Sequence, residues 1–168
     1  MGDAVIGRAI AIAMLAAAAV TPAWADLKED FQECVAQGQS LLNNDVAKVV
    51  AACSRLADAG NAEGEYHLGV LLENGQGMTQ DYAAAAHWYH AAAEQGFALA
   101  QYSLGYMYER GLGVPQDNVQ AHLWYNLAAA QGNADAAQAR DFVAHRMSQP
   151  QIAAAQRLAA NWRPKVGS

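Results

Sequence analysis

The sequence predicts an all-α protein, an α-solenoid built from stacked helix-turn-helix hairpins. Residues 60–95 and 96–131 align without a gap and are identical at 16 of 36 positions, and internal periods of this length mark stacked supersecondary units. The residues that recur late in each unit are spaced by three and four, which places them on one helical face. They are Ala85, Trp88, Tyr89, Ala92, Ala93 and Gly96, matched by Ala121, Trp124, Tyr125, Ala128, Ala129 and Gly132.

Residues 1–25 have the features of an export signal. Arg8 gives a weakly positive start, residues 9–20 form a short apolar run, and the Ala-Trp-Ala motif ending at Ala25 fits the small-x-small cleavage pattern. The apolar run is too short to span a bilayer comfortably. A buried N-terminal helix is the alternative interpretation. We therefore expect a bacterial protein that is periplasmic or secreted after cleavage behind Ala25.

Residues 26–59 are predicted to form a degenerate first hairpin, with Ala52 and Cys53 where the repeats carry Trp-Tyr. Cys34 and Cys53 are equally distant from the centre of a predicted turn at 41–46, so an antiparallel hairpin brings them opposite each other. In an oxidising compartment an even number of cysteines usually means a disulfide. We predict a Cys34–Cys53 bond, with two reduced and buried thiols as the alternative.

One glycine recurs at the same position inside the first helix of the two repeat units, as Gly69 and Gly105. A glycine in a helix interior costs about 1 kcal/mol relative to alanine. Its repetition therefore predicts a close helix crossing that has no room for a Cβ atom. The loop that follows each first helix carries Gly-x-Gly and ends in an aspartate, Asp81 or Asp117, which is a natural N-cap for the second helix.

The first unit reads YHLGVLLENGQGMTQDYAAAAHWYHAAAEQG over residues 66–96 and resembles the Sel1-like repeat, a relative of the tetratricopeptide repeat. The resemblance is carried by Leu-Gly, the Gly-x-Gly loop, the Asp cap, the Ala-x-x-Trp-Tyr run and the final Ala-Ala-x-x-Gly. Two units, within residues 60–132, contain the full set. The resemblance implies four hairpins in a short right-handed superhelix.

Residues 132–162 are expected to form a C-terminal capping hairpin, because a terminal unit is atypical when one of its faces meets water. Asn133 is a candidate N-cap for its first helix. Ser148 with Gln151 forms a capping box for its second helix. Residues 163–168 are expected to form a flexible tail.

Neither a reaction nor a cofactor is indicated by the sequence. The formal net charge of −6 and the presence of only three lysines leave no basic patch for nucleic acid or an anionic membrane. Nucleophile motifs, His-Glu-x-x-His and phosphate-binding loops are missing. Three histidines, His87, His90 and His122, could bind a transition metal if their faces met, but His87 and His90 flank the Trp-Tyr pair and are expected on the solvated side. We predict no enzyme activity, no cofactor and no metal.

The resemblance implies that the first helix of each hairpin lines an inner groove. Tyrosine combines a large contact area with a polar tip, which suits recognition. Tyr66 and Tyr102, identical in the two units, could instead pack the hairpins together, whereas Tyr106 replaces Val70 and so marks a position that varies within the repeated frame. The candidate partner-binding residues are Glu63, Tyr66, Val70, Glu73, Asn74, Leu99, Tyr102, Tyr106, Glu109 and Arg110.

The function implied by the resemblance is an exported, non-enzymatic interaction module that binds a peptide segment or protein partner in this groove. An envelope glycan or peptidoglycan is the alternative partner, because tyrosines can stack on sugars. A hydrolase acting on the cell wall or on β-lactams is a third and remote reading, since such activity has been attributed to cysteine-rich relatives of the repeat. The single predicted disulfide and the missing nucleophile–base constellation argue against it.

Overall fold

The computed structural model describes residues 23–36 and 46–165, and every regular element within these ranges is an α-helix. This confirms the predicted all-α class. Residues 1–22 of the predicted export signal (1–25) and residues 41–45 of the predicted turn (41–46) lie outside the described residues. The helices are α1 (Ala23–Val35), α3 (Val46–Asp58), α4 (Ala62–Asn74), α5 (Tyr82–Glu94), α6 (Ala98–Arg110), α7 (Asn118–Ala130), α8 (Ala134–Ala144) and α9 (Gln149–Asn161).

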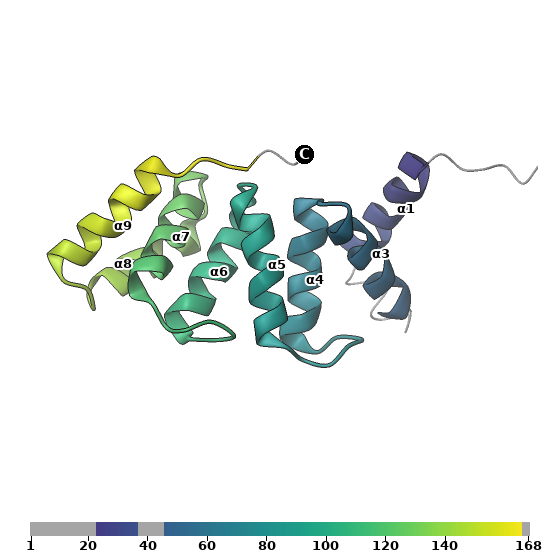
Figure 1. Cartoon of the computed structure of the whole chain (residues 1–168), viewed down its shortest axis with the longest axis horizontal. Helices are drawn as coiled ribbons and strands as arrows, with labels where there is room; N and C mark the ends of the chain where they lie inside the picture. Colours follow the sequence, from purple (N-terminus) through teal and green to yellow (C-terminus); the bar gives the residue numbers. More distant parts are fainter. Residues whose placement is uncertain (1–22, 37–45, 166–168) are drawn as a thin grey trace, which may run out of the picture.

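The helices follow one another across the molecule in chain order, from α1 at one end to α9 at the other (Figure 1). Each hairpin is formed by neighbours in sequence: α1 packs on α3, α4 on α5, and α6 on α7. Successive hairpins are joined by packing of α3 on α4 and α5 on α6, while α7 packs on both α8 and α9. The arrangement is the predicted α-solenoid, in which each unit contacts its neighbours.

A glycine notch holds the central tyrosine of each repeat. A Cβ atom added to Gly69 would lie 2.7 Å from the ring of Tyr89, and one added to Gly105 would lie 2.6 Å from the ring of Tyr125. Both tyrosines are buried. The predicted close crossing of the two helices in each repeat is therefore confirmed. The space for each tyrosine ring is provided by the glycine on the other helix of the same hairpin, as well as by alanines.

The loop between the two helices of a repeat is shaped by its glycines and its aspartate. Gly111 ends α6 in the left-handed region at φ 69°, and Gly113 also has a positive φ of 68°. A Cβ atom on Gly113 would lie 2.1 Å from the carbonyl oxygen of Tyr82 in the preceding hairpin, so the loop packs directly on that backbone. Asp117 and Asp81 cap the helices that follow, each accepting hydrogen bonds from two backbone N–H groups.

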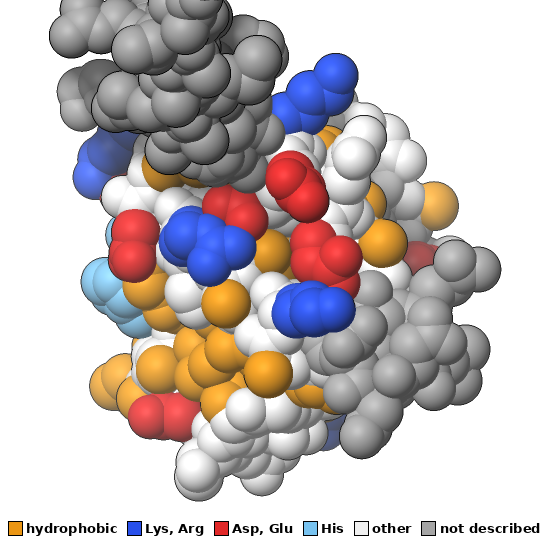
Figure 2. All heavy atoms as spheres, turned by 90° about the vertical axis from the view of Figure 1, so that its right-hand side faces the viewer, with side chains coloured by type: hydrophobic (Ala, Val, Ile, Leu, Met, Phe, Trp, Pro, Cys, Tyr) orange, Lys and Arg blue, Asp and Glu red, His pale blue; other side chains and the backbone are white. Residues whose placement is uncertain are grey.

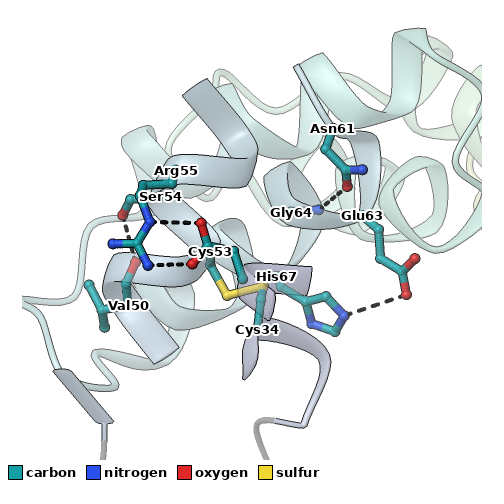
Figure 3. The surroundings of a disulfide bond; sticks show 10 residues. Cys34, Val50, Cys53, Ser54, Arg55, Asn61, Glu63, Gly64 and His67 are labelled. Atoms are coloured by element: carbon teal, nitrogen blue, oxygen red, sulfur yellow. Dashed lines mark hydrogen bonds and ion pairs between the residues drawn. A yellow bond between two sulfur atoms is a disulfide. The ribbon is translucent and has the colours of Figure 1, made fainter. Parts of the chain in front are cut away.

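The predicted disulfide joins α1 to α3, with the Cα atoms of Cys34 and Cys53 5.0 Å apart (Figure 3). Both cysteines are buried, in a small hydrophobic core to which α1, α3 and α4 contribute. Beside them the guanidinium group of Arg55 on α3 binds both carboxylate oxygens of Asp30 on α1, with an Nε–Oδ2 distance of 2.7 Å. The hydrogen bond from Arg55 lowers the pKa of Asp30. The first hairpin is thus held by a covalent bond and an ion pair in place of the Trp-Tyr packing of the repeats.

Both helices after the second repeat have the predicted caps. Asn133 accepts a hydrogen bond from a backbone N–H in the first turn of α8, at 2.9 Å. At the start of α9 the side-chain oxygen of Gln151 accepts the backbone N–H of Ser148 at 2.8 Å. The polar sequence signals that bound α8 and α9 therefore act through local hydrogen bonds, as a capping interpretation requires.

The segment that follows α9 runs back along the stack towards α5 (Figure 1). The indole ring of Trp162 lies edge-on to that of Trp124, at a centroid distance of 6.4 Å. The backbone N–H of Lys165 donates to the carbonyl of Glu94 at 2.7 Å, and the two side chains form an ion pair. Residues 163–165, the start of the predicted tail, are thus attached to the end of α5.

Candidate functional site

An open groove of about 500 Å³ lies between α6 and α8, with α7 at its base. It brings together four of the ten residues predicted to bind a partner, all of them on α6, with residues of α8 that the prediction did not include. Aromatic, acidic, basic and amide side chains all contribute. The lining residues are Tyr102, Tyr106, Glu109, Arg110, Tyr125, Asp135, Gln138, Ala139 and Phe142.

The α8 side of the groove continues the 36-residue register of the repeats. Residues 132–162 were predicted to form a capping hairpin without partner-binding residues, because the Trp-Tyr pair is not repeated there, yet the same interval carried once more reaches the groove residues of α8. This register was the signal available for finding them. The corresponding pairs are Leu99 with Asp135, Tyr102 with Gln138, Tyr106 with Phe142, and Arg110 with Arg146.

Two of these positions form an aromatic–arginine pair on each helix. The guanidinium carbon of Arg110 lies 5.6 Å from the ring centroid of Tyr106, and that of Arg146 lies 5.1 Å from the ring of Phe142. In both pairs the arginine follows the aromatic residue by four positions, which places the side chains next to each other on a helix, at cation–π distance. Tyr106 is 36% exposed and Phe142 is 58% exposed, so both rings remain open to a partner.

The carboxylate of Glu109 is bound within the protein. It is only 5% exposed, and it accepts a hydrogen bond from the hydroxyl of Tyr125 at 2.9 Å and one from Arg146 at 3.2 Å. Burial, followed by the hydrogen bond to Glu109, raises the pKa of Tyr125, so its hydroxyl remains a donor. In the first repeat Glu73 accepts from Tyr89 at 2.6 Å in the same way. Both predicted glutamates thus organise the helices that carry the groove.

The predicted residues of α4 lie outside this groove, whose walls come from α6, α7 and α8. Glu63 lies 4.0 Å from the ring nitrogen of His67, and the amide of Asn74 turns back to donate to the carbonyl of Val70 at 2.9 Å. Leu99, at the start of α6, is 47% exposed but also lies outside the groove lining. Of the predicted residues, the groove therefore contains only those of the second repeat, and its other wall comes from the helix that follows.

Tyr66 and Tyr102, which occupy the same position in the two repeats, differ in their surroundings. The ring of Tyr66 lies 5.3 Å from Phe97 and 5.8 Å from Tyr89, centroid to centroid, and packs against the central core. The ring of Tyr102 lies 5.7 Å from that of Tyr125 and also lines the groove. Burial raises the pKa of both Tyr66 and Tyr102. Tyr66 is therefore a packing residue, whereas Tyr102 both packs and faces the groove.

A second cavity, also of about 500 Å³, lies between α1 and α3. Figure 2 shows this end of the molecule, where acidic and basic side chains are interspersed around uncovered hydrophobic ones. Asp30 and Arg55, which line the cavity, form the ion pair beside the disulfide. This cavity thus lies over structural contacts of the first hairpin, and it lacks the exposed aromatic rings of the α6–α8 groove.

The histidines do not form a metal site within the part of the chain that the structure describes, where no group of three or more His, Cys, Asp or Glu residues is placed to hold an ion. His87 is exposed, and His90 lies 3.8 Å from a carboxylate oxygen of Glu94. His122 is buried, and burial, followed by the charge of Arg140, lowers its pKa. Across the described residues, no helix is both long and apolar enough to cross a membrane.

Comparison with known proteins identifies the repeats. Residues 62–97 and 98–133 each match the Sel1 repeat family. The chain is similar to c5321, described as a protective antigen present in uropathogenic Escherichia coli strains displaying an SLR fold, with a TM-score of 0.76 and 27% identity. That match covers 82% of this chain and only 30% of c5321. No match was found among curated proteins.

A Sel1 repeat protein from Oxalobacter formigenes is similar over 70% of this chain and 96% of its own, with a TM-score of 0.58 and 34% identity. The chain therefore belongs to the Sel1 repeat family, which confirms the resemblance stated from the sequence. Sel1 repeats commonly mediate protein–protein interaction, and the family is generally non-catalytic. A groove on the repeat stack is accordingly the candidate binding site for a protein partner.

Proposed function

We propose that the protein is an exported, non-enzymatic interaction module that binds a peptide segment of a protein partner in the α6–α8 groove. The observation that carries the proposal is the presence of two open aromatic rings, Tyr106 and Phe142, with Arg110 in or beside the same groove. Aromatic and arginine side chains are the residues that most often dominate binding energy at protein interfaces. The groove is also formed by rigid helices, which lowers the entropy lost on binding.

Export is supported by two features of the chain. The Cys34–Cys53 disulfide is compatible with an oxidising compartment, and the apolar run at 9–20 with the small-x-small motif has the order of an export signal. Expression of the full chain followed by mass measurement of the periplasmic fraction tests this part. A mass that corresponds to a start at Asp26 supports it, and an uncleaved protein confined to the cytoplasm contradicts it.

The groove is tested by a double substitution, Tyr106→Ala with Arg110→Ala. Both side chains are exposed, so we expect unchanged helicity and melting temperature, together with loss of the partner that the parent captures in a periplasmic pull-down. Arg157→Ala with Leu158→Ala is the matched control, because these residues form an exposed arginine and apolar pair on α9, outside the groove. Capture that survives the groove substitutions excludes this groove as the binding site.

An envelope glycan is the second candidate partner. The groove places Tyr102 and Tyr106 beside Gln138 and Asp135, so that rings able to stack on a sugar lie near acceptors and donors for its hydroxyl groups. Sedimentation with purified peptidoglycan sacculi distinguishes this partner from a peptide. A β-lactam hydrolase gains no support from the groove, whose lining contains no Ser, Thr, Cys, Lys or His side chain. A cell-wall glycosidase would need two carboxylates, and Glu109, one of the two in the lining, is already bound by Tyr125 and Arg146. Turnover by the purified protein would overturn the non-enzymatic proposal.

A further inference from the structure

We infer that the α6–α8 groove selects an extended peptide that carries one carboxylate next to an apolar side chain, with the carboxylate on Arg110 and the apolar group on Tyr106 and Phe142. This rests on the proposed function and adds the chemistry of the partner to it. Three properties of the described residues support the inference: the charge of Arg110, the position of the rings, and the acidic residue at the opposite end of the groove.

Arg110 has no carboxylate within ion-pair distance among the residues that the structure describes. Its counterpart Arg146 is bound by Glu109, 37 residues earlier. Glu73 likewise precedes Arg110 by 37 residues, but these two side chains form no ion pair. Glu73 instead accepts a hydrogen bond from the hydroxyl of Tyr89. The guanidinium group of Arg110 is exposed and held over a ring. A guanidinium in this position presents a forked set of donors that matches a carboxylate.

The exposed rings adjoin this cation. Tyr106 lies under Arg110, and Phe142 occupies the same register position on α8, across the groove. Phe142 is 58% exposed even with Arg146 beside its ring, and together with Tyr106 it leaves apolar surface open within a polar rim, which is typical of an interaction site. An apolar side chain next to a bound carboxylate would cover both rings. The apolar contact and the charge contact are therefore made by adjacent residues of one peptide.

The other end of the groove is acidic, which argues against a peptide with many carboxylates. Asp135 has the register position of Leu99, which precedes Arg110 by 11 residues on α6, a rise of about 16 Å along a helix. An extended peptide crosses that distance with about five residues. A second carboxylate at that end would face Asp135, and the formal net charge of −6 adds a general repulsion. A single acid at the Arg110 end avoids both.

The experiment is a selection from a phage-displayed library of random twelve-residue peptides against the full chain, exported so that the disulfide forms. We expect the selected peptides to carry Asp or Glu beside Leu, Ile, Phe or Trp. Arg110→Glu should instead select Lys or Arg at that position. A synthetic peptide from the first selection should bind Arg110→Glu at least about tenfold more weakly than the parent, and its acid-to-lysine version should show the reverse order.

Two control variants separate charge at the groove from charge elsewhere. Arg110→Lys keeps the charge and should keep the preference for an acid, and Arg157→Glu on α9 reverses a charge outside the groove and should select the same peptides as the parent. Two outcomes would overturn the inference and leave the proposed function standing. In the first, binding of the selected peptides depends on Tyr106 and Phe142 but the peptides show no preference for an acidic residue. In the second, Arg110→Glu leaves the preference for an acidic residue unchanged. If no peptide is enriched, or the enriched peptides bind equally well after Tyr106→Ala, both fail.

Discussion

Replacing Gly105 by alanine is expected to destabilise the protein by about 2 kcal/mol, although the same change in an unconstrained helix interior stabilises by about 1 kcal/mol. The new Cβ atom would lie 2.6 Å from Cδ1 and 2.7 Å from Cε1 of Tyr125. That ring is 1% exposed, and its hydroxyl is fixed by the hydrogen bond to Glu109. The ring therefore cannot move away without loosening a buried contact.

The magnitude follows from three contributions to the free energy of unfolding. Forcing an extra methyl group into a well-packed site costs about 1–3 kcal/mol. Losing a hydrogen bond to a charged group costs about 1.5–3 kcal/mol in full, and a ring that shifts part of the way loses a fraction of it. The helix propensity of alanine returns about 1 kcal/mol. The sum is a net loss of about 2 kcal/mol, which corresponds to a melting temperature about 4–8 °C lower for a domain of this size.

Urea unfolding followed by far-UV circular dichroism measures the change. Gly69→Ala is an internal replicate, because its Cβ atom would meet the ring of Tyr89 at 2.7 Å. In a Tyr125→Leu background the ring is gone, so the same Gly105→Ala substitution should cost much less. A Gly105→Ala variant as stable as the parent, or equally destabilised in both backgrounds, would refute the notch as the reason for the glycine.

The disulfide, a buried histidine, and the arginines Arg110 and Arg146 give three further predictions. Cys34→Ser with Cys53→Ser should lower the free energy of unfolding in urea by about 3 kcal/mol, because the bond links residues 19 apart. The pKa of His122 is lowered in the fold, so the unfolded chain takes up a proton first as pH falls. Its contribution to stability is complete above about pH 6.5 and is lost as pH falls through that value towards the folded pKa, which melting curves from pH 8 to pH 5 would show. Arg146→Ala should cost about 1 kcal/mol by leaving a buried carboxylate without its cation, whereas Arg110→Ala should leave the melting temperature unchanged.

Each of these has a control within the chain. Dithiothreitol should lower the urea midpoint of the parent and leave that of the double serine variant in place. His122→Ala restores the residue found at the equivalent position Ala86 and should flatten the pH dependence; an unchanged slope would assign the dependence to other groups. Arg140 opposes and Asp141 favours the protonated form of His122, so both are kept in that comparison. Equal effects of the two arginine substitutions would contradict the difference in pairing.

The sequence was informative wherever a structural feature depends on nearby residues. Asp81 and Asp117 cap helices two and three residues ahead of them, and the repeat register was enough to predict the helices. The crossing at Gly69 was predicted from repetition, because a costly residue in the same place twice implies a constraint. The disulfide followed from the hairpin geometry of two equidistant cysteines. These inferences needed no knowledge of how the hairpins stack.

The groove could be predicted only in part, because its composition depends on contacts distant in sequence. The role of Glu109 is decided by Tyr125, 16 residues later, and by Arg146, 37 residues later. No local pattern distinguishes it from an exposed groove acid. Phe142 was missed because the Trp-Tyr motif does not extend past the second repeat, although the 36-residue interval continues to it. The surroundings of Tyr66 likewise depend on Phe97 of the next hairpin.

Site-specific photocrosslinking in cells tests most directly whether the α6–α8 groove is where the partner binds. The photoreactive amino acid p-benzoylphenylalanine would replace Tyr106 in one variant and Leu158, exposed on α9, in another. Irradiation of cells that export the two variants should give a covalent adduct of defined mass at position 106 and none at position 158. An adduct formed at position 158 but not at position 106 would contradict the assignment of the groove.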